Sequence, residues 1–98
     1  MIEHLVLFRC KETCNEETKS KIVSEARALK KNIPELLYIS AGINWSERGD
    51  GFELALVGRF QDKATLDIYQ NHPAHQAFVN EWVKPHIEKV IAIDYFIE

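Results

Sequence analysis

Residues 69–78 bring together the side chains of this sequence that are best suited to acid-base chemistry. Tyr69, His72 and His75 place a phenol and two imidazoles within seven positions. Pro73 disfavours a helical backbone at His72 and is well placed to begin a new helix, so His75 is expected in that helix's first turn. The partial positive charge there disfavours imidazolium and keeps such a histidine neutral, able to accept a proton. This segment is therefore the candidate site, with Tyr69 as hydrogen-bond donor.

The same side chains have simpler interpretations. Tyr69 resembles a core aromatic residue whose hydroxyl reaches water, and His72 and His75 can be polar residues of a helix junction. A metal site built from His72, His75, His4 and His86 is a further alternative, since histidines three positions apart can share one side of a helical turn. No carboxylate or cysteine completes a recognisable ligand set in the sequence, so neither a metal nor a cofactor is expected.

The size of the chain predicts a single domain that associates with a partner. It has 98 residues, 46% of them hydrophobic, and a formal net charge of −3. One domain, residues 1–98, fits this length, and a large share of its apolar surface would stay exposed if it stood alone. The sequence shows no basic stripe, which argues against a nucleic-acid partner and against an anionic membrane.

Two further features favour a cytoplasmic location. The N-terminus leads directly into a strand pattern without a leader, and no apolar run approaches the length of a membrane span. Cys10 and Cys14 have no second cysteine pair that would complete a zinc site or a disulfide scaffold. They are therefore expected to be free thiols.

Alternating residues predict four strands, over residues 2–11, 36–44, 52–61 and 89–97. A hairpin loop over residues 46–51 joins the middle two. In the third strand, Phe52 is expected to share a face with Leu54, Leu56 and Phe60, because the spacing between them is even.

Helical spacing of apolar residues predicts a long amphipathic helix over residues 15–32, after the capping-box pattern Thr13-Cys14-Asn15-Glu16. Asp62 is a suitable N-cap for a short helix through Tyr69. A second helical piece follows Pro73 and runs through Trp82, and Pro85 is expected to end it.

This order of elements is that of the ferredoxin-like β-α-β-β-α-β fold, a four-stranded antiparallel sheet with both helices on one face. The face without helices is also apolar, and its residues are Leu5, Leu7, Ala55, Val57, Ile91 and Ile93. A second copy of the same sheet is the simplest cover for such a face. The sequence therefore predicts a homodimer with its sheets face to face.

Several short motifs follow one another along the chain. The most specific is Tyr69-x-x-His72-Pro73-Ala74-His75-x-x-Phe78, accompanied by Glu3-His4-Leu5-Val6 with Phe8, Ile33-Pro34-Glu35-Leu36, Gly42-x-Asn44, Phe60-x-Asp62 and Asp94-Tyr95. In these motifs the chain resembles the stress-responsive A/B barrel (Dabb) family over essentially its whole length. The resemblance implies a dimeric α+β barrel, and many proteins of the family have no assigned role.

The resemblance also implies a chemistry. A plant polyketide cyclase of the family, which works without metal or organic cofactor, has a tyrosine and two histidines that match Tyr69, His75 and His4. A further pocket histidine of that enzyme falls on Leu54, so the polar part of this pocket is reduced. The implied reaction is proton abstraction next to a carbonyl, with His75 as general base and Tyr69 hydrogen-bonding the enolate oxygen. His4 would position or relay the proton.

The implied pocket lies between sheet and helices and would take a small apolar carbonyl compound. Its expected substrate-binding residues are Val6, Phe8, Ile22, Ala26, Leu56, His72, Phe78, Val79 and Val90. The apolar ones at these spacings are equally those of an ordinary core. Three functions therefore stay open: a small-molecule binding protein of the family, a cofactor-independent cyclase or lyase-like enzyme, and a structural stress-associated barrel.

Overall fold

One antiparallel sheet forms the base of the structure, a computed structural model that describes residues 1–97. Its strands run in the order β2-β3-β1-β4, with bounds β1 (Ile2–Cys10), β2 (Tyr38–Ile43), β3 (Phe52–Phe60) and β4 (Ile87–Phe96). β2 is shorter than the sequence pattern predicts and β4 begins two residues earlier. The central strands β1 and β3 carry the core, because each has a strand on both sides.

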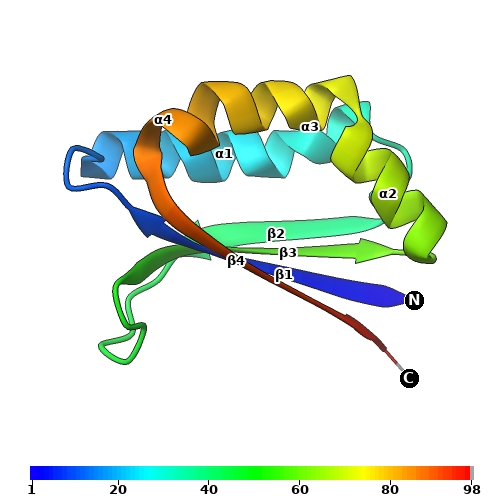
Figure 1. Cartoon of the computed structure of the whole chain (residues 1–98), viewed down its shortest axis with the longest axis horizontal. Helices are drawn as coiled ribbons and strands as arrows, with labels where there is room; N and C mark the ends of the chain where they lie inside the picture. Colours follow the sequence, from blue (N-terminus) through cyan, green and yellow to red (C-terminus); the bar gives the residue numbers. More distant parts are fainter. Residues whose placement is uncertain (98) are drawn as a thin grey trace.

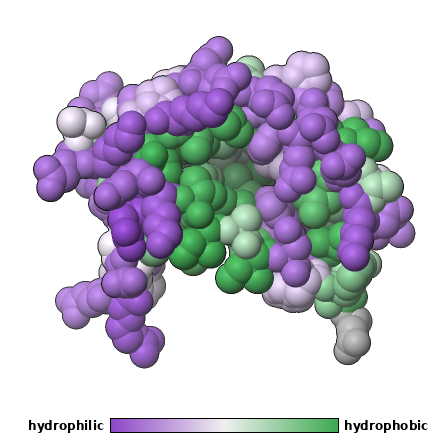
Figure 2. All heavy atoms as spheres, viewed as in Figure 1, coloured by the Kyte–Doolittle hydropathy of each residue, from purple (hydrophilic) through white to green (hydrophobic). Residues whose placement is uncertain are grey.

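The helices lie together on one face of this sheet (Figure 1). They are α1 (Glu16–Asn32), α2 (Lys63–Asn71), α3 (Pro73–Phe78), the π-helix η1 (Val79–Val83) and the short α4 (Lys84–His86). The predicted ferredoxin-like fold is therefore confirmed. Along β1, and along β3 from Leu54 onward, alternate residues are buried under the helices, and those between them stay half-buried on the opposite face. Figure 2 shows apolar side chains gathered beneath the hydrophilic outer surface of the helices.

Helix α1 begins one residue later than predicted, and its cap differs from the predicted capping box. Asn15 is the N-cap, and its side chain accepts a hydrogen bond of 2.8 Å from the Thr18 amide. The Cys14 amide donates to the Lys11 carbonyl, so the chain is still turning before Asn15 and Thr13 cannot cap the helix. Helix α1 therefore starts after this turn has ended.

The predicted position of Phe52 is wrong, because strand β3 contains a bulge. Phe8 pairs with Leu54 but Arg9 pairs with Phe52, which leaves Glu53 as the extra residue. Phe52 consequently shares the face of Arg9, whose guanidinium lies 4.8 Å from the Phe52 ring centroid. A bulge re-aims side chains at the end of a ladder.

The break between α2 and α3 falls where the sequence predicts it. His72 has an extended backbone, and Pro73 is the first residue of α3. Beyond Phe78 the chain continues as the π-helix η1, in which the Lys84 amide donates to the Val79 carbonyl. Pro85 does not end the helical run as predicted. It lies in α4, one residue before the helical run ends at His86, and β4 begins at Ile87.

Candidate functional site

A cavity of about 250 Å³ lies between the sheet and the segment from α2 to η1. Its walls are mostly apolar, and its polar side chains come from β1, α2 and α3. The lining consists of His4, Val6, Phe8, Leu56, Tyr69, Gln70, His75, Phe78, Val79, Val83, Val90 and Ala92. The Tyr69 ring centroid is 4.5 Å from that of His75 and 6.1 Å from that of His4, so the three lie together.

His75 is held as a neutral base. Its Nδ1 lies 3.1 Å from the Gln70 carbonyl oxygen. A carbonyl only accepts hydrogen bonds, so Nδ1 carries the proton and Nε2 keeps a free lone pair. Burial lowers the pKa of His75; the Gln70 carbonyl opposes this shift, and His4 adds to it when its own ring is protonated. The sequence argument attributed neutrality to the helix N-terminus, whereas burial is the main cause here.

His4 is held in the same tautomer by a carboxylate. It is only 4% exposed, and its Nδ1 is hydrogen-bonded to Asp94, its cross-strand neighbour in β4. An ionised carboxylate accepts only, so Nδ1 donates, and in the neutral form of the ring Nε2 keeps its lone pair. On the other side His4 pairs with Gly58, where an added Cβ would come within 3.3 Å of Leu36 and Phe60.

Tyr69 is a buried phenol that keeps its proton. Its ring is 2% exposed and packs 4.9 Å from the centroid of Phe60. Burial raises the pKa of Tyr69 well above its usual value. Within residues 1–97 its hydroxyl makes no hydrogen bond to the protein.

Three polar atoms therefore open onto the cavity: the Tyr69 hydroxyl and Nε2 of both His4 and His75. None of them has a protein partner, yet among residues 1–97 no fully buried side-chain nitrogen or oxygen is left without one. Each must consequently be accessible, and the cavity is the space that all three line. The arrangement supplies one hydrogen-bond donor and two proton acceptors in an apolar setting.

The other predicted pocket residues divide into two groups. Six of them line the cavity: Val6, Phe8, Leu56, Phe78, Val79 and Val90. Ile22 and Ala26 lie instead in the packed core. His72 lies outside the lining too, because its Nδ1 accepts a 3.0 Å hydrogen bond from the Ala74 amide and so caps α3. His86 packs near Trp82, 6.0 Å between centroids.

Sequence reasoning missed Gln70, Val83, Ala92 and Asp94. The pairing of Asp94 with His4 depends on the register between two strands at opposite ends of the chain. A carboxylate among the apolar residues of a strand was the available signal.

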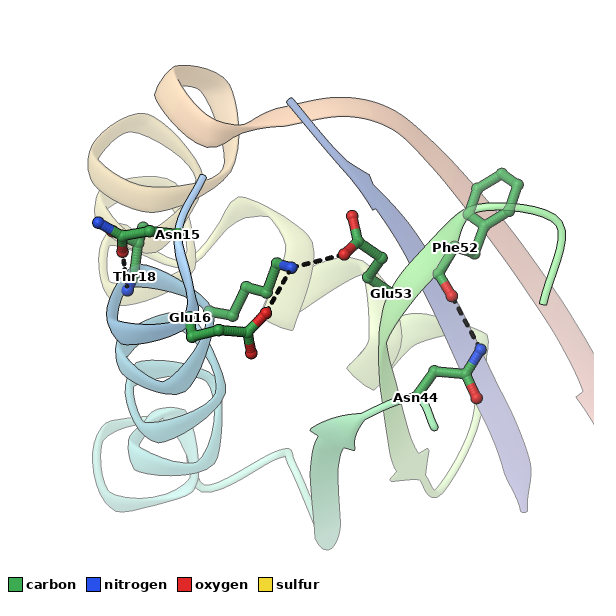
Figure 3. Close-up of polar contacts among 7 residues, drawn as sticks. Asn15, Glu16, Thr18, Asn44, Phe52 and Glu53 are labelled. Atoms are coloured by element: carbon green, nitrogen blue, oxygen red, sulfur yellow. Dashed lines mark hydrogen bonds and ion pairs between the residues drawn. The ribbon is translucent and has the colours of Figure 1, made fainter. Parts of the chain in front are cut away.

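A second polar cluster lies at the other end of the sheet. The Lys19 ammonium is 3.0 Å from a Glu16 carboxylate oxygen and 2.5 Å from one of Glu53, the bulge residue (Figure 3). These hydrogen bonds, first that to Glu53, raise the pKa of Lys19. Cys10 and Cys14 are free and buried beside it, and burial together with Cys14 raises the pKa of Cys10 to about 12.

Neither cluster has the composition of a metal centre. Across residues 1–97, no group of three or more histidines, cysteines and carboxylates is arranged to hold a metal ion. The helices of this part of the chain are also too short or too polar to cross a membrane.

Comparison with known proteins identifies the family. The family model described as "Stress responsive A/B Barrel Domain" matches residues 2–97. The chain belongs to this Dabb family. It is 27% identical to a stress-response A/B barrel domain-containing protein of Arabidopsis thaliana, in a match that spans all of this chain but only 37% of the plant protein. It is 33% identical to an uncharacterized protein of Streptomyces coelicolor, over 84% of this chain and 87% of that protein.

Solved structures share this Dabb fold. A dimeric ferredoxin-like protein from Thermobifida fusca superposes with a TM-score of 0.86 at 23% identity, over 98% of this chain and 90% of that one. Hydroxynitrile lyase from Passiflora edulis has a TM-score of 0.87 at 24% identity, over 99% and 93%. At these identities the likeness shows the fold alone.

Proposed function

We propose that this Dabb protein binds a small, largely apolar carbonyl compound in the cavity that holds Tyr69 and His75. The observation that carries the proposal is the presence of three unpartnered polar atoms on otherwise apolar walls. A ligand oxygen beside the Tyr69 hydroxyl would accept the hydrogen bond for which the hydroxyl has no acceptor within the protein. Apolar cavities with a few converging polar groups are the usual form of small-molecule sites.

The test is a screen of small apolar aldehydes and ketones by protein NMR. Binding compounds should shift the resonances of cavity residues such as Val6 and Val79. His75→Ala should weaken binding, whereas His86→Ala, which lies outside the lining, should leave it unchanged. Equal effects of the two substitutions would contradict the proposed site.

The homodimer is part of the proposal. The sheet face opposite the helices exposes apolar side chains, with Ile93 50% exposed, and it comprises Leu5, Leu7, Ala55, Val57, Ile91 and Ile93. Several proteins of the same fold are described as dimeric. A second copy would remove this surface from water.

Sedimentation should therefore show a dimer at micromolar concentration, and Val57→Lys should split or unfold it. An unpaired charge buried in an apolar interface costs several kcal/mol. Ser24→Lys, which adds the same charge to the exposed side of α1, is the matched control and should stay dimeric. A monomeric parent protein would contradict this part of the proposal.

A second candidate is a cofactor-independent enzyme of cyclase or lyase type. The free Nε2 of neutral His75 next to the Tyr69 hydroxyl favours it, because these groups can remove a proton beside a carbonyl and stabilise the enolate oxygen. His4, oriented by Asp94, would position the substrate. Its test is hydrogen–deuterium exchange at the α-carbon of bound ketones, which His75→Ala should abolish. Without ligand or exchange, the purely structural barrel is what remains.

A further inference from the structure

The unpartnered polar atoms of His4, Tyr69 and His75 limit which polar group a ligand of the cavity can carry. This inference rests on the proposed function. His4 and His75 have each committed the Nδ1 proton, to Asp94 and to the Gln70 carbonyl respectively. In its neutral form each therefore presents only an acceptor, Nε2, to the cavity. Among the buried groups of the lining, Tyr69 supplies the donor, whereas the amide of Gln70 belongs to an exposed residue. A well-matched head group must give a proton as well as receive one.

The charges around the cavity further limit the class of ligand that it can bind. No lysine or arginine occurs among its lining residues, and the Asp94 carboxylate is hydrogen-bonded to His4. A carboxylate or phosphate head would meet two nitrogen lone pairs and no counter-charge. An ammonium head would leave water for apolar walls, where the carboxylate behind His4 is already hydrogen-bonded.

We infer that the cavity selects small neutral molecules whose apolar body ends in a hydroxyl group, as an alcohol or as the enol of a carbonyl compound, and that it excludes carboxylates. A hydroxyl has both a donor and an acceptor, so it can serve Nε2 of His75 and the Tyr69 hydroxyl, whose rings are neighbours with centroids 4.5 Å apart. An aldehyde or ketone that cannot enolise satisfies only the Tyr69 donor.

Four compounds that share a phenyl-bearing apolar body and differ in the head group test this inference on the whole chain. They are 2-phenylethanol, phenylacetate, 2-phenylethylammonium and ethylbenzene. Their dissociation constants are measured by NMR titration. The alcohol should bind about tenfold more tightly than any of the others, the change expected from one hydrogen bond made in place of one lost. Tyr69→Phe should reduce the advantage of the alcohol over ethylbenzene and leave ethylbenzene unaffected. His86→Ala should change nothing.

The outcomes separate the inference from the proposed function. Tightest binding of phenylacetate or of the ammonium compound would overturn the inference while a ligand site remains. Equal affinities for ethylbenzene and the alcohol would do the same, since the open atoms would then distinguish no head group. Failure of all four compounds, together with failure of the carbonyl screen, would overturn both.

Discussion

The polar clusters at the two ends of the sheet differ in how far their hydrogen bonds are satisfied. At one end the Lys19 ammonium is shared between Glu16 and Glu53, so the buried charge has two partners. At the other end the rings of His4, Tyr69 and His75 lie together, yet each keeps one polar atom without a protein partner. The first cluster is complete in the free protein, and the second is not.

This difference shows that burial of polar residues does not by itself mark a functional site. Buried charges are normally paired, so Lys19 and Glu53 satisfy a structural requirement. Hydrogen-bonding capacity that folding leaves unused has no such explanation. The completed cluster should therefore govern stability, and the incomplete cluster should govern recognition.

The largest effect is expected from breaking the completed cluster. Lys19→Met should lower the free energy of unfolding by about 2 kcal/mol, because it strips the charge partner from Glu53 in a partly buried site. Lys21→Met, which breaks the exposed pair with Glu25, is the control and should cost about 0.5 kcal/mol. Urea denaturation measures both. Similar losses in the two variants would remove the distinction between the clusters.

A smaller loss of stability is expected when His72 or His75 is replaced. His75→Ala and His72→Ala should each cost about 1 kcal/mol, the first through the bond to Gln70 and the second through the cap on α3. Their effects on ligand affinity should differ, because only His75 lines the cavity. Thermal denaturation and NMR titration of the two variants provide the measurement. Loss of binding in His72→Ala would argue against this assignment.

Acidification should produce a modest loss of stability that depends on His75. Its pKa is lowered from 6.5 in the folded protein, so the unfolded chain takes up the proton first. Stability contributed by the neutral form is complete above about pH 6.5 and falls as the pH drops toward the lowered pKa, by at most about 1.4 kcal/mol per pH unit. The slope should be smaller in His75→Gln. An unchanged slope would assign it to another group.

The smallest effect is expected from the buried phenol. Tyr69→Phe should change the free energy of unfolding by no more than about 0.5 kcal/mol, because the hydroxyl it removes has no protein partner to leave unpaired. Calorimetric melting checks this. A loss above about 1.5 kcal/mol would mean that the hydroxyl takes part in the protein's own hydrogen bonding.

Local patterns predicted the elements and part of the site. Alternation located the strands, and Pro73 located the helix break that brings Tyr69 and His75 together. The features that the sequence did not predict depend on the register between paired strands. The bulge at Glu53 reverses the face of Phe52, and the bond between His4 and Asp94 joins strands that are distant in sequence. Neither alternation nor spacing within one segment carries that information.

The π-helix η1 also bears on how the domain tolerates changes in length. Each residue of an α-helix advances the chain by about 100°, so deleting one from the middle of α1 would turn part of its buried face toward water. Deleting the exposed Asn80 would instead tighten the wide turn over residues 79–83 into an α-helical one. We therefore expect single-codon deletions to survive in this turn and to be lost from α1, which a deletion library screened for soluble folded protein would reveal.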